Sequence, residues 1–142
     1  MSSITVIRSL TSASVMLSGV VHLVLWAQGM SGLSVVGPAF LVNAVAGLAL
    51  GVLVQLWDHW LPLLASAGFG AATLGAFVLS TTVGFFGVHE QWRGPAVWLA
   101  AVSEALAIAL GAVGAWRVRL EGRGAAGGSV AAEAAHRPGS RA

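Results

Sequence analysis

The sequence contains no cysteine, no lysine and no tyrosine, and only 8% of its 142 residues are charged. Without cysteine, the chain can form no disulfide and can supply no thiolate for catalysis or metal binding. Soluble domains carry about 25% charged residues, because water must solvate their surface. This chain has too few charges for such a surface, so we expect a lipid bilayer to be its main solvent and partner.

All seven basic residues are arginines, and the formal net charge is only +2. A nucleic-acid-binding protein would carry a basic stripe on a soluble fold, whereas these arginines stand mostly at the ends of apolar segments. We therefore interpret the arginines as signals of membrane orientation and expect no nucleic-acid partner.

Long apolar runs are what the sequence has in abundance, since 57% of its residues are hydrophobic. A helix needs about 20 apolar residues to cross the hydrocarbon core of a bilayer. Four stretches reach this length and predict transmembrane helices over residues 4–27, 35–57, 61–88 and 95–116. Short connections favour antiparallel neighbours. The predicted fold is all-α, an integral membrane four-helix bundle with up-down-up-down order.

The composition changes after Trp116 to a segment rich in Gly, Ala, Ser and Arg. Such a segment buries too little apolar surface to offset the entropy lost on ordering. We therefore predict a membrane domain over residues 1–120, followed by a disordered cytoplasmic tail over residues 121–142.

Arginine placement predicts the orientation in the membrane. Arg8 stands near the start of the first span, while Arg117, Arg119 and Arg123 follow the fourth. Because positive residues favour the cytoplasmic side, we expect both termini in the cytoplasm. Tryptophan favours the headgroup region, and all six tryptophans lie near predicted span ends: Trp26, Trp57, Trp60, Trp92, Trp98 and Trp116.

Small residues at helical spacing predict how the spans pack, because helices in lipid associate through close backbone approach and hydrogen bonds. Gly47 and Gly51 make a GxxxG pattern in the second span. The first span carries a polar stripe at similar spacing, formed by Thr11, Ser14, Ser18 and His22. Each span thus has one small or polar face for a bundle.

The spans contain one acidic residue, Glu104, and one histidine, His22. A charge at the bilayer centre costs about 2.5–3.5 kcal/mol even on the insertion scale, so such a residue is a candidate for function. At about 1.5 Å per residue, Glu104 lies roughly 14 Å and Asn43 roughly 12 Å from the outer ends of their spans. On the same basis Thr81 and Thr82 lie at about 10 Å and His22 at about 7 Å.

His89, Glu90 and Arg93 follow the third predicted span and would form an outer rim. Together with the polar residues of the outer half, they predict a polar pocket that opens outward around Glu104. Structural alternatives stay open: Glu104 could bond Asn43 or a serine of a neighbouring helix, and the rim could be a loop with a local ion pair.

No cofactor or metal is predicted. Bis-histidine haem needs two facing histidines inside the spans, and only His22 qualifies. His22, His89 and Glu90 lack the spacing of a zinc site. No catalytic residue is predicted, and we do not expect an enzyme. Two functions stay open: a small proton-linked carrier that uses Glu104, and an accessory or structural subunit of a larger membrane complex. Homo-oligomer formation also stays open.

Three short segments carry a family resemblance: FLVNAVAG over residues 40–47, GPAF just ahead of it over residues 37–40, and TTVGFFGVHE over residues 81–90. They resemble a group of small, uncharacterised four-span membrane proteins of high-GC Gram-positive bacteria. The resemblance covers the four spans and excludes the tail. It implies four helices in the inner membrane, and it assigns no role to any residue.

Overall fold

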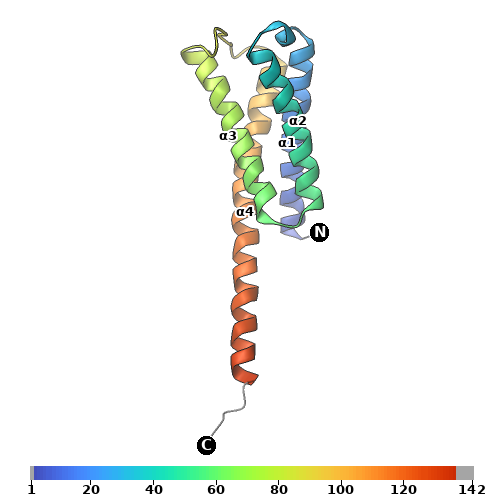
Figure 1. Ribbon diagram of the computed structural model, residues 1–142, viewed down its shortest axis with the longest axis vertical. Coiled ribbons are helices and arrows are strands. Elements are labelled where there is room, and N and C mark those ends of the chain that lie inside the picture. Colours follow the sequence, from blue (N-terminus) through green and yellow to red (C-terminus); the bar gives the residue numbers. More distant parts are fainter. Residues whose placement is uncertain (1, 137–142) are drawn as a thin grey trace, which may run out of the picture.

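The computed structural model describes residues 2–136, with side chains as far as Gly124. These residues form four long helices: α1 (Ser3–Ala27), α2 (Val36–Leu56), α3 (Trp60–Thr82) and α4 (Pro95–His136), with a short turn η1 (Met30–Gly32) between α1 and α2. In Figure 1 the N-terminus and the α2–α3 connection lie at one end of the bundle, and the other two connections lie at the opposite end. The prediction of an all-α fold with four helices is confirmed.

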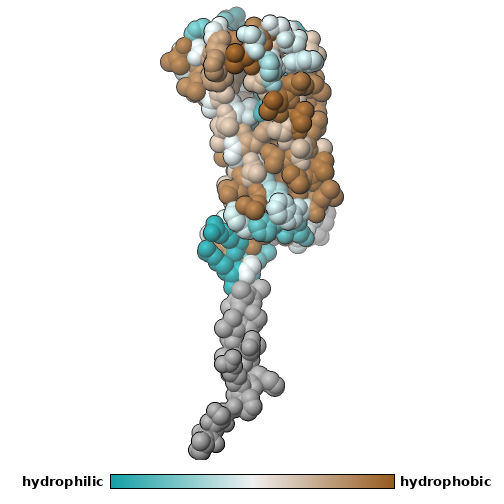
Figure 2. All heavy atoms as spheres, in the orientation of Figure 1, coloured by the Kyte–Doolittle hydropathy of each residue, from teal (hydrophilic) through white to brown (hydrophobic). Residues whose placement is uncertain are grey.

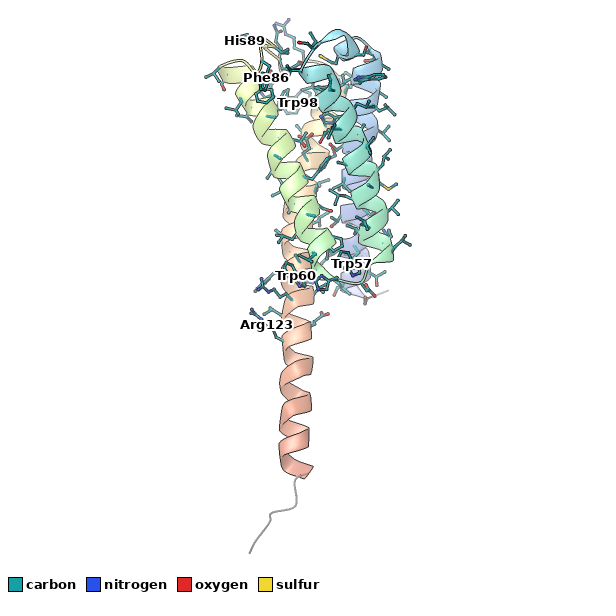
Figure 3. All side chains as sticks on the ribbon, viewed as in Figure 1. Trp57, Trp60, Phe86, His89, Trp98 and Arg123 are labelled. Carbon is teal, nitrogen blue, oxygen red and sulfur yellow. The ribbon has the colours of Figure 1, made fainter. Side chains whose placement is uncertain are left out.

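All four helices are long and apolar enough to cross a membrane. Hydrophobic residues cover the visible side of the bundle between its ends, and hydrophilic residues gather toward the ends (Figure 2). Large apolar side chains such as Val42 and Leu56 are exposed on this surface. Figure 3 places Trp57 and Trp60 at one end of the bundle and Trp98 at the other. The structure therefore has the surface of a multi-pass membrane protein.

The third helix ends at Thr82 and not at Val88, where the sequence analysis ended it. Gly84 adopts a φ of 85°, and its N–H donates to the Leu79 carbonyl at 3.1 Å. Phe86, at a φ of 48°, and Gly87, at 81°, continue in the left-handed region, which no α-helix uses. Residues 83–94 consequently form a loop that folds back over the end of the bundle.

The fourth helix continues to His136, well beyond the predicted end of the span at Trp116. A disordered tail is therefore not confirmed over residues 121–136, and residues 137–142 lie outside the described part of the chain. Six of residues 121–136 are alanine, the strongest helix former, and they favour the helix although four glycines oppose it. No proline interrupts the sequence between Pro95 and Pro138.

Close approach of backbones holds α1 against α2. A Cβ atom on Gly47 would lie 2.6 Å from the Val15 carbonyl oxygen, and one on Gly19 would lie 2.9 Å from the Ala44 carbonyl oxygen. The predicted GxxxG face of α2 is therefore used inside the bundle. α1 also packs against α4, and α4 against α3, whereas α2 and α3 contact each other little.

Arg8 connects three segments of the chain at the start of the first span. Its side chain is buried, and its guanidinium donates to the carbonyls of Val54, of Trp57 at 2.6 Å and of His59 at 3.4 Å. The last carbonyls of a helix lack partners within the helix, and a cation is favourable at this end of the helix dipole. Arg8 thus ties the start of α1 to the end of α2 and the start of α3.

We expect Gly47→Ala to destabilise the protein by about 1–3 kcal/mol, because the new methyl group overpacks a backbone contact. Gly75→Ala is the matched control, since nothing lies within 4 Å of an added Cβ there. Replacing glycine by alanine in an open helical position should stabilise by up to about 1 kcal/mol. Thermal unfolding in detergent, followed by circular dichroism, measures both variants. Equal stability of the two would contradict the α1–α2 contact.

Candidate functional site

The two titratable residues of the spans meet inside the bundle. His22 on α1 and Glu104 on α4 are 7% and 2% exposed, and His22 Nε2 lies 3.8 Å from Glu104 Oε1. The fully buried Ser18, one turn before His22, donates its hydroxyl to the same carboxylate oxygen at 3.3 Å. The structure thus joins two predicted site residues and adds Ser18. The polar stripe of the first span contained the signal for Ser18, through its spacing of four from His22.

A hydrogen bond to the backbone determines which ring nitrogen of His22 carries a hydrogen. His22 Nδ1 lies 2.8 Å from the backbone carbonyl oxygen of Ser18, which can only accept, so Nδ1 carries a hydrogen. In a neutral imidazole, Nε2 would then face Glu104 Oε1 with a lone pair, and an ionised carboxylate has only lone pairs to offer in return. A proton on Nε2 or on the carboxyl group would make the 3.8 Å contact between His22 and Glu104 favourable.

Two cavities meet at this pair. The main cavity has a volume of about 300 Å³ and lies between α1, α2, α3 and the loop after α3. The side cavity, of about 60 Å³, reaches Glu104. Four residues line both cavities: His22, Phe40, Phe77 and Glu90. One water needs about 10–15 Å³, so the side cavity can hold a few water molecules beside the carboxylate.

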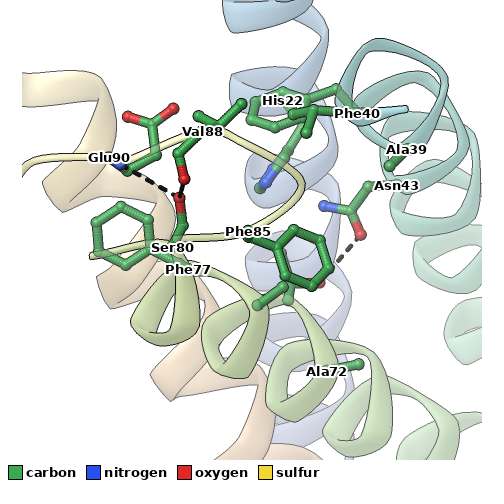
Figure 4. A pocket seen from close by; sticks show the side chains of 13 residues that line it. His22, Ala39, Phe40, Asn43, Ala72, Phe77, Ser80, Phe85, Val88 and Glu90 are labelled. Carbon is green, nitrogen blue, oxygen red and sulfur yellow. Dashed lines mark hydrogen bonds between the residues drawn. The ribbon is translucent and has the colours of Figure 1, made fainter. Parts of the chain in front are cut away.

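Asn43 on α2 faces the main cavity from the side opposite α3. Its amide oxygen accepts a hydrogen bond from the Thr73 hydroxyl at 3.0 Å. Its amide nitrogen Nδ2 is buried and has no hydrogen-bond partner among the described residues. Figure 4 shows this nitrogen turned toward the side of the cavity where His22 lies. Of the two structural alternatives for Glu104, the bond to a serine of a neighbouring helix is the one observed, because Glu104 accepts from Ser18 while Asn43 contacts Thr73.

The loop after α3 covers the main cavity and is held by one serine. The buried Ser80 donates its hydroxyl to the Val88 carbonyl at 3.0 Å and accepts the Glu90 backbone N–H at 3.2 Å (Figure 4). These two bonds place Phe85, Val88 and Glu90 along the cavity wall. Sequence analysis missed Ser80, because it continued the third helix through this region.

Four predicted pocket residues do not line either cavity: Thr81, Thr82, His89 and Arg93. The hydroxyls of Thr81 and Thr82 donate to carbonyls of their own helix, at Val78. The exposed His89 lies against Gly84, where an added Cβ would be 2.6 Å from its ring nitrogen. Arg93 is exposed on the loop and makes no ion pair with Glu90 among the described side chains. Thr81 and Thr82 thus lie in the last turn of α3, and His89 and Arg93 lie on the exposed side of the loop that follows it.

Within the part of the chain that the structure describes, no three His, Asp or Glu side chains gather closely enough to hold a metal ion. His22 and Glu90 line both cavities, whereas His89 lines neither cavity. The site therefore consists of two titratable side chains, 3.8 Å apart, beside a largely apolar cavity.

Comparison with known proteins gives no further guide to this site. A scan against protein-family models finds no match, and neither do searches of the curated proteins and of the solved structures.

The contact between Ser18 and Glu104 is measurable as a coupling energy. In a double-mutant cycle of Ser18→Ala and Glu104→Leu, we expect a coupling of about 0.6–1.7 kcal/mol, the range found for hydrogen bonds between membrane helices. Unfolding of the four proteins in mixed micelles provides the measurement. Ser14→Ala replaces Ser18→Ala in the control cycle, because the Ser14 hydroxyl binds only the Leu10 carbonyl of its own helix. Equal coupling in both cycles would argue against the contact.

Proposed function

We propose that the protein is a small proton-linked carrier that binds a molecule in the main cavity and couples its movement to the proton held by His22 and Glu104. The observation that carries this proposal is the position of the pair. His22 lines both cavities, and Glu104 lines the side cavity, so the proton lies next to the bound molecule.

A purely structural role would not require two titratable groups. The Ser18 hydroxyl bond to Glu104 already links α1 to α4, and a glutamine at position 104 could accept the same bond. Ionisable groups in membrane helices are costly and typically mark proton or substrate pathways. A pair of them beside a space that admits water supports proton transfer better than it supports a packing role.

Glu90 offers a path from the pair to the surface. It is only partly buried on the loop after α3, and it lines both cavities. A proton from the aqueous phase can thus pass by Glu90 and the water of the side cavity to Glu104. Binding of a molecule in the main cavity would change the surroundings of His22 and with them the proton affinity of the pair.

We further propose that the helices cross the inner membrane of a bacterial cell in up-down-up-down order, with both termini cytoplasmic and the main cavity on the outer side. The support comes from arginine: Arg8, Arg117, Arg119 and Arg123 stand toward the end of the bundle opposite the loop after α3 (Figures 1 and 3). Positive residues favour the cytoplasmic side.

The lack of cysteine allows a direct test of this orientation on the full chain. A membrane-impermeant maleimide applied to intact cells should label Ser31→Cys, which lies in the exposed turn between α1 and α2. Gly124→Cys, on the exposed part of α4, should be labelled only after the cells are permeabilised. The reverse pattern would place the termini outside and contradict the proposal.

The coupling is tested in proteoliposomes that contain a pH-sensitive dye. A panel of neutral, cationic and anionic single-ring compounds is added outside, and the lumenal pH is followed. We expect one class to change the lumenal pH with the wild-type protein, and Glu104→Gln to abolish this change because an amide cannot exchange the proton.

Ser103→Ala is the control for this assay, since the neighbouring Ser103 is buried but bonds only the Ala100 carbonyl of its own helix. It should behave as the wild type. A wild-type protein that binds a compound of the panel in its cavity and moves no proton would overturn the carrier function.

A further inference from the structure

Basic side chains gather where α4 leaves the bundle. Arg117, Arg119 and Arg123 are exposed on the turns of α4 that follow Trp116. Figure 2 shows hydrophilic residues at this end of the bundle, and Figure 3 places Arg123 just beyond Trp60. Tryptophan rings favour the headgroup region of a bilayer, and Trp116 is 64% exposed at this end. The arginines therefore lie at the depth where lipid headgroups meet the helices.

Helical spacing divides the charges of this segment between two faces of α4. Residues four apart share a face of a helix, whereas residues two apart point to opposite sides. Arg119 and Arg123 consequently share one face, and Arg117 shares the opposite face with the exposed Glu121. Trp116 lies three residues before Arg119 and belongs to its face. The face that contains Trp116, Arg119 and Arg123, here called the arginine face, thus carries two positive charges and, on these turns of α4, no carboxylate.

Trp60, the first residue of α3, holds Arg119 in place. Arg119 Cζ lies 5.0 Å from the centre of the Trp60 ring, and a guanidinium over an aromatic ring is attracted by the electrons of the ring. Trp60 itself is half-buried and packs against the core residues Val54, Leu63 and Ala115. Stacking uses the flat face of a guanidinium and leaves the N–H groups at its edge to donate. Arg119 is therefore positioned before any partner binds.

An anion fits between the two arginines of this face. Like charges four residues apart on a helix repel each other and destabilise it. A phosphate accepts strong hydrogen bonds from guanidinium groups, so one phosphate near both side chains would remove the repulsion. Neither Arg119 nor Arg123 forms an ion pair among the side chains that the structure describes. The Asp58 carboxylate lies 3.5 Å from Arg8 Nε, and Glu121 lies on the opposite face of α4. Charge complementarity thus favours an anionic partner from the bilayer.

We propose that the arginine face binds the headgroup of an anionic phospholipid, with the phosphate between Arg119 and Arg123 and with Trp60 as the positioning residue for Arg119. A zwitterionic headgroup fits less well, because its own cation repels the arginines. The acyl chains of the bound lipid would run along the apolar surface of the bundle, where Val113, three residues before Trp116, is exposed. This proposal goes beyond the carrier function and does not depend on it, since the arginine face lies at the end of the bundle opposite the loop after α3 (Figures 1 and 3).

Two phospholipids with the same acyl chains test the site. The full chain in a mild detergent is titrated with phosphatidylglycerol and, separately, with phosphatidylcholine, and native mass spectrometry measures the apparent Kd of the first bound lipid. We expect the wild-type protein to bind phosphatidylglycerol about 25-fold more tightly, because each of two basic residues near an anionic lipid contributes about fivefold. Equal binding of the two lipids by the wild-type protein would overturn the proposal.

Matched arginine variants separate the arginine face from general surface charge. Arg119→Gln and Arg123→Gln should each lower the preference for phosphatidylglycerol about fivefold. Arg117→Gln removes the same charge on the opposite face, beside Glu121, and should leave the preference nearly unchanged. All three positions are exposed, so the variants should fold as the wild type does. An equal loss in Arg117→Gln and Arg119→Gln would mean that charge alone attracts the lipid, and the site would be refuted.

The role of Trp60 is tested by keeping and by removing an aromatic ring at this position. Trp60→Phe retains a ring face for the guanidinium and should keep most of the preference for phosphatidylglycerol, whereas Trp60→Leu should lose it to the extent that Arg119→Gln does. Binding of phosphatidylcholine reports any general change of the bundle and should be equal in the two variants. The same preference in Trp60→Phe and Trp60→Leu would contradict the positioning role.

Discussion

Close contact between helix backbones is the constraint on which the rest of this structure depends. Lipid gives no hydrophobic force to hold one apolar helix against another, so packing must come from small residues and hydrogen bonds. Because Gly47 has no side chain, the backbone of α1 can contact α2 directly. Gly70 does the same for α3 and α4, since a Cβ there would lie 2.6 Å from the Glu104 carbonyl oxygen. These contacts leave α2 and α3 apart. The main cavity lies on that side because no small-residue contact closes it.

The hydrogen bonds of the hydroxyl groups distinguish supporting residues from those of the site. The hydroxyls of Ser14 and Ser66 donate to carbonyls four residues earlier in their own helices, so these bonds do not link two helices. Ser18 instead reaches across to Glu104, and Thr73 reaches across to Asn43. Both of these interhelical bonds lie in the half of the bundle that contains the cavities. Hydrogen bonds that join side chains of two helices thus lie where the bundle is hollow, whereas Ser12 and Arg8 bind backbone carbonyls at and after α2 away from the cavities.

Sequence patterns predicted the number and type of the helices, because span length and apolar composition are set by the thickness of the bilayer. They also identified His22, Asn43, Glu104 and Glu90, each of which lines a cavity. The end of α3 was not predictable in the same way, since residues 83–88 are as apolar as a helix. Their backbone differs because Gly84 takes a positive φ. This local choice made Ser80 the residue that holds the loop, whereas Thr81 and Thr82 stay in the last turn of α3 and bind the Val78 carbonyl.

Arg8 has a consequence for the order in which the protein is built. Its carbonyl partners at Val54, Trp57 and His59 follow it in the sequence by 46, 49 and 51 residues. During synthesis, its guanidinium stays unpaired until α2 has crossed back and the chain has turned into α3. The contacts of the guanidinium therefore form only when the first two helices make a hairpin, in which the carbonyl groups accept its hydrogen bonds and the Asp58 carboxylate, 3.5 Å from Arg8 Nε, supplies the opposite charge. A single early arginine thus makes the final packing of the first helix depend on the arrival of the second.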